Sequence, residues 1–372
     1  MTVQDRDGLY MAQALRLAAK GQSTVSPNPM VGALVVRHGR IVGEGFHRGP
    51  GHPHAEILAI RQAGSRAKRA TLYVTLEPCC HLKKRTAPCV PAVVRSGVSR
   101  VVIAMRDPNP SVMGKGVAVL RRAGISVTIG VAREQAEELN IAYTHWIKTK
   151  RPFVTLKAGT SLDGQIATAS GESRWITGES SRRDAHRLRA QMDAVLVGVG
   201  TVLSDDPALT ARIGPRLNRL APRQPLRIVV DSRLRIPAKA RILGRQNVAK
   251  TIVAMTDSAP GARRSVLEKR GIETIVLPTV KGRISLPALL NELGRRGITC
   301  VILEGGSELN GAMLRAKLVQ RVRLYLAPVL LGGSESKGLL GGISPARLNQ
   351  AVALRRIRMR SIGSDILVEG DV

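Results

Sequence analysis

Residues 71–105 of the 372-residue chain read TLYVTLEPCCHLKKRTAPCVPAVVRSGVSRVVIAM, and this stretch decides the fold of the first half. Residues 71–76 and 100–105 are short apolar runs rich in β-branched side chains, which is typical of buried strands. Between them lie a polar loop and an apolar segment, residues 90–95, that we expect to be helical. A strand, a helix and a second strand in this order predict a layered α/β domain.

The sequence on either side continues this alternation of helix and strand. Residues 7–20 have apolar side chains at helical spacing and end at Gly21, and two apolar runs around His38-Gly39-Arg40 predict a hairpin. The other elements expected in the first half are helices over residues 54–63, 114–123 and 133–147 and strands over residues 31–36, 41–46 and 126–129.

The segment HWIKTKRP, residues 145–152, marks a junction, because Pro152 disfavours helix at the residue before it. A new series of elements begins after it. We expect strands over residues 153–158, 194–200, 227–231, 251–255, 273–277, 299–303 and 322–331, and helices over residues 180–192, 262–270, 286–296 and 308–318. The sequence therefore predicts two α/β domains, residues 1–148 and 152–372.

The composition limits the class of protein. Hydrophobic residues make up 44% of the chain, which excludes disorder from a lack of core-forming side chains. The apolar runs are too short to span a membrane, and the acidic start MTVQDRDG is unlike a signal peptide. The net charge of +31 suggests a nucleic-acid partner, but it is spread over both halves, and two Phe, two Trp and four Tyr leave little for base stacking.

Three of the four cysteines lie between Cys79 and Cys89, downstream of His54-Ala55-Glu56. Zinc binds thiolate and imidazole, and a catalytic zinc keeps three protein ligands with water at the fourth position. His54, Cys79 and Cys89 are the candidate ligands, and Cys80 stays open as an alternative. Glu56 is the candidate for moving protons between water and substrate. The competing interpretation is a pair of buried thiols and a helix-capping histidine.

This pattern resembles the zinc-dependent nucleobase deaminases, whose signature is H-x-E followed by P-C-x-x-C. Here the second Pro-Cys pair comes ten residues after Cys79. With SPNPMVG at 26–32, TLEPCCH at 75–81 and DPNP at 107–110, the chain is similar to the pyrimidine deaminases of riboflavin biosynthesis. The resemblance implies a cytidine-deaminase-like three-layer domain that binds one Zn²⁺ per chain. It implies substrate contacts from Asn28, His47, His81 and Arg85, the last two suiting a sugar phosphate.

No G-x-G-x-x-G motif follows a strand in the second half, so a Rossmann dinucleotide site is not indicated. Instead VILEGGS, residues 301–307, leads from a strand through glycines into a helix N-terminus, which offers backbone N–H groups to a phosphate. KAGTSLDG at 157–164, GESRWIT at 171–177 and TVLSDDPALT at 201–210 precede it in order. Together they resemble the dihydrofolate-reductase-like reductase domain of the same bifunctional family.

The resemblance also implies the residues of a reductase site. Those expected to bind NADPH are Gly159, Trp175, Thr201, Asp205, Ser232, Gly306, Ser307, Glu308, Leu309, Asn310, Gly311 and Ala312. Those expected to bind the phosphorylated substrate are Ser173, Arg189, Leu209, Arg212 and Glu304. Asp205 is the acid expected nearest the hydride transfer, and arginine is the residue type that suits a phosphate clamp.

The function implied by the resemblance is zinc-dependent hydrolytic deamination of 2,5-diamino-6-(5-phosphoribosylamino)pyrimidin-4(3H)-one. NADPH then reduces the ribosyl group to ribityl, giving 5-amino-6-(5-phosphoribitylamino)uracil. We expect a cytoplasmic homo-oligomer that acts on small phosphorylated pyrimidines, with no specific nucleic acid and no membrane as partner. The alternative, motivated by the charge, is a nucleic-acid or nucleoside deaminase with a basic binding half. That alternative predicts a lone deaminase domain and an aromatic-bearing second half.

Overall fold

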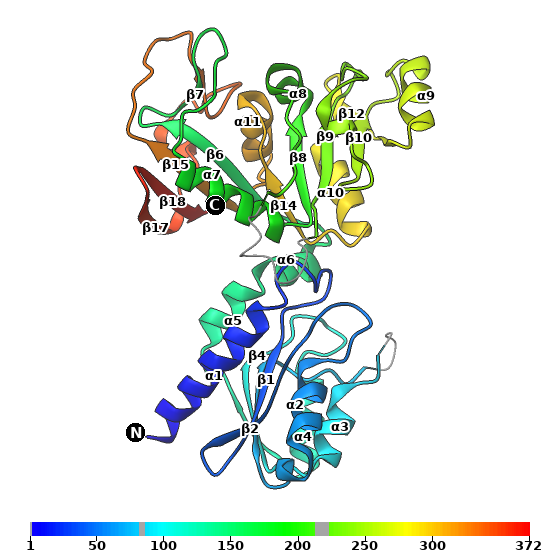
Figure 1. Ribbon diagram of the computed structural model, residues 1–372, viewed down its shortest axis with the longest axis vertical. Helices are drawn as coiled ribbons and strands as arrows, with labels where there is room; N and C mark the ends of the chain where they lie inside the picture. The colour runs from blue at the N-terminus through cyan, green and yellow to red at the C-terminus, as the bar shows by residue number, and fades with distance from the viewer. Residues whose placement is uncertain (1, 82–85, 213–222) are drawn as a thin grey trace. The chain divides into compact units, whose positions relative to one another are not determined.

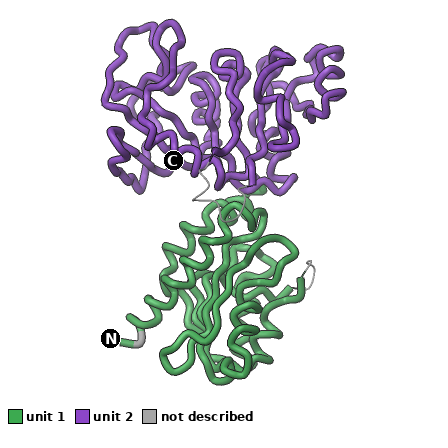
Figure 2. Tube along the Cα trace, in the orientation of Figure 1, with its two compact units in different colours: residues 1–150 green, residues 151–372 purple. Residues whose placement is uncertain are grey.

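The structure is a computed structural model that describes residues 2–81, 86–212 and 223–372. The chain divides into two compact units, residues 1–150 and residues 151–372 (Figure 2). Among the described residues, no helix is both long and apolar enough to cross a membrane.

Unit 1 is built around a five-stranded sheet in the order β2-β1-β3-β4-β5 (Figure 1). β1 pairs antiparallel with both β2 and β3, whereas β3–β4 and β4–β5 are parallel. The hairpin and the strands expected at residues 71–76, 100–105 and 126–129 are confirmed. The strands are β1 Gly32–Arg37, β2 Arg40–Phe46, β3 Thr71–Leu76, β4 Arg100–Met105 and β5 Ser126–Ile129.

Helices cover both faces of this sheet, which gives the expected three layers (Figure 1). Two glycine positions explain how closely they pack. A Cβ at Gly32 would lie 2.0 Å from the Ala14 carbonyl of α1, and one at Gly43 would lie 2.1 Å from the Ala59 carbonyl of α2. Glycine is therefore required on each face. The helices are α1 Val3–Ala19, α2 Ala55–Ala63, α3 Cys89–Arg95, α4 Lys115–Arg122, α5 Arg133–Leu139 and α6 Ile141–Thr149, with a 3₁₀ turn at Gly64–Ala67.

The single helix expected over residues 133–147 is wrong, because it is divided at Asn140 into α5 and α6. Asn140 leaves helical geometry, with φ −106° and ψ 22°, and its side chain is buried. Its amide oxygen accepts from the Met30 N–H at 2.8 Å, and its amide nitrogen donates to the Met30 carbonyl at 3.0 Å. A tertiary contact therefore overrides the local helical pattern.

Unit 2 has a nine-stranded sheet in the order β11-β10-β9-β8-β14-β6-β15-β18-β17. The strands from β11 to β15 pair in parallel, and β18 and β17 are added antiparallel at one edge. The strands are β6 Phe153–Ser161, β8 Ala194–Gly198, β9 Leu226–Val230, β10 Thr251–Met255, β11 Glu273–Val276, β14 Cys300–Leu303, β15 Arg321–Ala327, β17 Arg355–Ile362 and β18 Asp365–Asp371. Short pairs join β7 Gln165–Ala167 to β16 Lys337–Gly338, and β12 Thr279–Val280 to β13 Arg283–Ile284.

Two hydrophobic clusters lie on opposite faces of this sheet. Val301 and Leu303 pack with α10 and α11, whereas Ile302 between them packs with α7, α8 and α9. This alternation follows from the two-residue period of a strand. The helices are α7 Glu179–Gln191, α8 Val199–Asp205, α9 Gly261–Lys269, α10 Leu286–Arg295 and α11 Ser307–Arg315.

Three details of unit 2 differ from the sequence prediction. The strand expected over residues 322–331 ends at Ala327, because Pro328 has no N–H to continue the ladder. Residues 199–200, expected at the end of a strand, begin helix α8. Strand β17 was also not predicted. Its side chains are mostly exposed and half of them are arginine, so they give no buried apolar pattern.

Candidate active sites

Three elements of unit 1 bring the candidate metal ligands together. His54 is the N-cap of α2, Cys79 follows the end of β3, and Cys89 is the first residue of α3. His54 Nδ1 lies 3.6 Å from Cys79 Sγ and 3.2 Å from Cys89 Sγ. Among the described residues, these three form the group whose ligand atoms all lie within 4.8 Å of one another. One imidazole and two thiols suit zinc, so the residues present fit the metal.

Direct contacts between Cys79 and Cys89 keep this geometry. The Cys89 N–H donates to the Cys79 carbonyl at 3.0 Å and also faces Cys79 Sγ at 3.4 Å. An N–H directed at sulfur, and the start of a helix beneath Cys89, both favour thiolate over thiol. Cys80 is outside the ligand group and packs against the hydrophobic core of the unit.

Glu56 lies in the cavity that contains this triad. The cavity has a volume of about 600 Å³, and Glu56, the second residue of α2, is only 3% exposed. Its Oε2 has no hydrogen-bond partner among the described residues. Burial, with a contribution from the nearby Cys79, raises the pKa of this carboxyl group. A buried carboxylate oxygen without a partner beside a metal triad is suited to exchange protons with a bound ligand.

Three of the four predicted substrate contacts of unit 1 line the same cavity. Asn28 Nδ2 lies 2.9 Å from His47 Nε2, and the His47 ring is 5.1 Å from the His54 ring. His81 also lines the cavity, and its Nδ1 is buried without a partner in the described part of the chain. Arg85 lies outside the described residues. The structure therefore brings Asn28, His47 and His81 to the metal triad.

A second wall of this cavity, formed by Asp107, Asn109 and Tyr143, was not predicted from the sequence. The Tyr143 hydroxyl, on α6, donates to Asp107 at 3.1 Å, and burial raises the pKa of Asp107 to about 6. Glu77 holds the loop that carries Asp107 and Asn109, because its carboxylate accepts from the backbone N–H groups of Asp107, Gly114 and Val117 at 3.4, 3.0 and 3.1 Å. The DPNP motif at residues 107–110 was the sequence signal for these two residues of the wall.

Unit 2 contains a cleft of about 1410 Å³, which is larger than a typical drug-sized site. Most of the predicted reductase residues line it. Those of the cofactor set are Gly159, Trp175, Thr201, Asp205, Ser232, Gly306, Ser307, Glu308, Leu309 and Ala312, and those of the substrate set are Ser173, Arg189, Leu209, Arg212 and Glu304. Asn310 and Gly311 do not line it. Asn310 is fully buried and donates to the Leu339 carbonyl, and Gly311 packs against Gly341.

One end of the cleft is a cluster of charged groups. Arg189 donates from Nε and Nη2 to the two oxygens of Glu304, at 2.8 and 2.9 Å, and Lys157 Nζ lies 3.8 Å from the same carboxylate. Burial opposes the charge on Glu304, but Arg189 and Lys157 outweigh it and lower its pKa to about 2. No role was predicted for Lys157 from the sequence. A lysine inside an apolar strand was the signal that could have found it.

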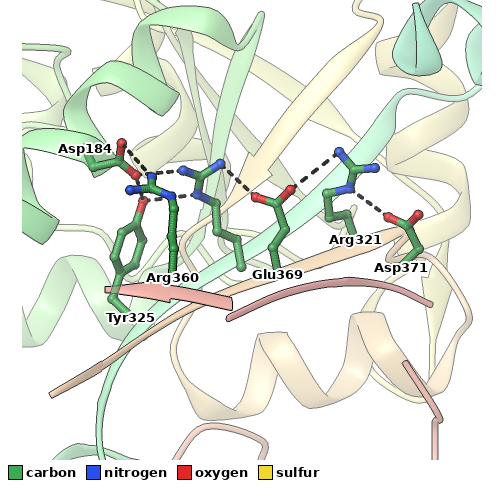
Figure 3. Close-up of polar contacts among 7 residues, drawn as sticks. Asp184, Arg321, Tyr325, Arg360, Glu369 and Asp371 are labelled. Atoms are coloured by element: carbon green, nitrogen blue, oxygen red, sulfur yellow. Dashed lines mark hydrogen bonds and ion pairs between the residues drawn. The ribbon is translucent and has the colours of Figure 1, made fainter. Parts of the chain in front are cut away.

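A polar network on the sheet supports this end of the cleft (Figure 3). Asp184 accepts from the Tyr325 hydroxyl at 2.8 Å and from Arg323 at 2.7 Å, and Arg323 in turn contacts Glu369 at 2.8 Å. The Tyr325 ring lies 5.7 Å from Lys157 Nζ, within cation–π range. The Tyr325 ring, beside which Lys157 lies, is therefore held in place by residues of strands β15 and β18 and helix α7.

Other residues that line the cleft fit a nicotinamide dinucleotide. Trp175 is 67% exposed rather than part of the core, and Arg182 stacks on its ring at 4.7 Å. Gly306 is the N-cap of α11, and its backbone opens onto the cleft. An exposed aromatic face and a helix N-terminus are features that bind a base and a phosphate. Asp205 accepts from the Ser173 hydroxyl at 3.5 Å.

Together the two folds and their sites define a two-domain enzyme that combines a zinc deaminase with a reductase. Residues 4–105 match the family model of the cytidine and deoxycytidylate deaminase zinc-binding region, and residues 152–368 match that of the RibD C-terminal domain. The chain belongs to the RibD family of riboflavin biosynthesis proteins.

Similar proteins match nearly end to end. The riboflavin biosynthesis protein RibD of Escherichia coli is 43% identical over 97% of this chain and 98% of its own, and that of Aquifex aeolicus is 40% identical over 98% of each. The solved structure of Acinetobacter baumannii RibD has a TM-score of 0.89 at 36% identity, covering 99% of both chains. A Thermotoga maritima diaminohydroxyphosphoribosylaminopyrimidine deaminase/5-amino-6-(5-phosphoribosylamino)uracil reductase has a TM-score of 0.86 at 34% identity, covering 100% of this chain and 99% of its own.

The protein is thus a bifunctional enzyme of riboflavin biosynthesis, a deaminase that uses zinc and a reductase that uses NADPH. The alternative of a nucleic-acid deaminase with a basic binding half is not supported, because the second half is a reductase domain.

Proposed function

We propose that the protein deaminates 2,5-diamino-6-(5-phosphoribosylamino)pyrimidin-4(3H)-one in unit 1. In unit 2 it would reduce the product, 5-amino-6-(5-phosphoribosylamino)uracil, to the ribityl compound. The observation that carries the proposal is the buried Oε2 of Glu56, without a partner among the described residues, in the same cavity as His54, Cys79 and Cys89. The names of the solved relatives supply the substrate class.

In the deaminase half, His54, Cys79 and Cys89 would hold zinc, which supplies the Lewis acidity that makes water a nucleophile at neutral pH. Glu56 accepts a proton at Oε2 and delivers it to the departing ammonia, a role for which its buried position suits it. Asn28 and His47, hydrogen-bonded to each other, orient the pyrimidine ring. His81 and Arg85 are assigned to the sugar phosphate.

In the reductase half, NADPH supplies the hydride, and the protein orients it. Trp175, Thr201, Ser232 and the N-terminal turn of α11 would bind the cofactor. The residues assigned to the phosphorylated substrate are Ser173, Arg189, Leu209, Arg212 and Glu304. Asp205 would hold a proton beside the ribose carbon that is reduced, and Ser173 contacts its carboxylate. We further propose that the protein is a cytoplasmic homo-oligomer without a specific nucleic-acid partner.

The experiment follows ammonia release and NADPH oxidation in one tube with zinc-replete protein. Glu56→Gln should abolish ammonia release but leave NADPH oxidation intact when the substrate is already deaminated. Asp205→Asn should abolish NADPH oxidation but leave ammonia release intact. Glu44→Gln, which neutralises an exposed carboxylate in β2, is the matched control and should change neither rate. If Glu56→Gln lowered both rates equally, the assignment of two separate sites would be wrong.

A further inference from the structure

The charged end of the reductase cleft contains a histidine to which the proposed function gives no role. His186 lies on α7 and lines the cleft together with Lys157, Arg189 and Arg212. Glu304 is the carboxylate that faces this cluster. The two guanidinium groups of Arg189 and Arg212 against one carboxylate leave an excess of positive charge, which suits a phosphate dianion.

The hydrogen bonds around His186 decide where its ring proton lies. The Arg212 backbone N–H donates to Nδ1 at 3.3 Å, and Arg189 Nη1 lies 3.4 Å from the same nitrogen. A neutral imidazole has one acceptor nitrogen, and both nitrogens of this ring face N–H donors. The assignment that satisfies two of the three donors makes Nδ1 the acceptor and puts the proton on Nε2. Nε2 lies 3.0 Å from Arg212 Nη2, which is also a donor.

Two N–H groups from different elements thus converge, and no described residue places an acceptor oxygen against both. A phosphate oxygen has the charge and the free lone pairs for this position. Charging the imidazole would place a second N–H against the backbone N–H of Arg212, so the geometry requires a neutral ring. Burial, then the charges of Arg189 and Arg212, lower the pKa of His186 to about 4, which agrees with that requirement.

We propose that His186 is a substrate-binding residue, whose neutral Nε2–H and the Arg212 guanidinium donate together to one oxygen of the substrate's phosphate monoester. The inference rests on the proposed function, because it takes Arg189 and Arg212 as the phosphate clamp. The same chemistry could come from a phosphate of NADPH, and the experiment separates the two sources.

The test uses the full chain with zinc. It measures KM and kcat of the reductase reaction, the Ki of ribose 5-phosphate as a competitive inhibitor of that reaction, and the Kd of NADPH by fluorescence. Hydrogen bonds to a charged group are strong enough that His186→Ala should raise KM and Ki about tenfold or more, with kcat and the NADPH Kd little changed. His186→Met, which fills the ring's space without a donor, should behave like His186→Ala. His186→Gln, which retains an amide donor, should restore most of the affinity.

Arg187→Ala is the matched control, because it removes a full positive charge from the next position of α7, where the side chain is exposed. It should leave KM and Ki unchanged. Wild-type values of KM and Ki for both His186→Ala and His186→Met would overturn the inference. Equal weakening by Arg187→Ala would also overturn it, since general charge would then explain the binding. Weaker NADPH binding with unchanged Ki would assign the oxygen to the cofactor. If Arg189→Ala left Ki unchanged, the phosphate clamp of the proposed function itself would fail.

Discussion

Asn140 and Met30, 110 residues apart, exchange two hydrogen bonds between a side chain and the backbone. Met30 lies between Pro29 and Val31, which line the deaminase cavity, and Asn140 immediately precedes α6, whose Tyr143 also lines it. The contact therefore ties two cavity-lining segments of unit 1 to each other.

Asn140→Ala should destabilise unit 1 by about 1–3 kcal/mol, because it leaves a donor and an acceptor of Met30 without partners in a partly buried site. KM of the deaminase reaction should also rise. Denaturant unfolding and steady-state kinetics measure the two effects. Asn140→Asp retains the acceptor for the Met30 N–H and should lose less stability than the alanine variant. Equal losses would show that the hydrogen bond to the Met30 N–H contributes nothing.

Zinc content should distinguish Cys89 from Cys80. Cys89→Ser should lower bound zinc well below one per chain, because it removes one of the three atoms that converge within 4.8 Å. Cys80→Ser should leave zinc unchanged, since Cys80 packs against the hydrophobic core. Atomic absorption on purified protein decides between them. Zinc loss in Cys80→Ser alone would mean that the ligand assignment is mistaken.

Glu77→Gln should raise KM of the deaminase reaction several-fold without removing zinc. The carboxylate accepts three backbone N–H groups, and an amide offers only one acceptor oxygen, so the loop with Asp107 and Asn109 loses part of its support. Kinetics on both half-reactions and zinc analysis test this. The reductase KM serves as the internal control. A loss of zinc in place of a KM effect would show that Glu77 supports the ligands instead.

Unit 2 should lose stability as the pH falls below 6.5. His186 has a folded pKa of about 4, below its ordinary value of 6.5, so the unfolded chain binds the proton more readily. The stabilisation is complete above pH 6.5 and is lost between pH 6.5 and about 4. At pH 5 we expect the free energy of unfolding to be lower by about 1–2 kcal/mol. This range allows for screening by solvent, because the ring is only partly buried.

Urea unfolding followed through Trp175 fluorescence, in a Trp146→Phe background, measures this loss at pH 7 and pH 5. His186→Gln cannot take up the proton and should show a smaller difference between the two pH values. An identical difference in wild type and His186→Gln would assign the pH dependence to other groups.

The sequence alone was enough to predict the class of each domain and most of its elements. Residues 71–76 and 100–105 are apolar on both sides because their strands are buried on both faces, and such runs are local signals. His54, Cys79 and Cys89 were recognisable because zinc requires particular side chains, and the motif fixes their spacing along the chain. Neither signal depends on knowing which residues meet.

What the sequence could not provide depends on contacts between distant residues. The helix break at Asn140 follows from the backbone of Met30, and the exposed position of Trp175 follows from the cleft in which it lies. The assignment of the proton to Nε2 of His186 depends on the backbone N–H of Arg212, which lies outside α7. Local patterns encode secondary structure and metal chemistry, whereas burial, pKa and tautomer depend on neighbours that only the tertiary fold supplies.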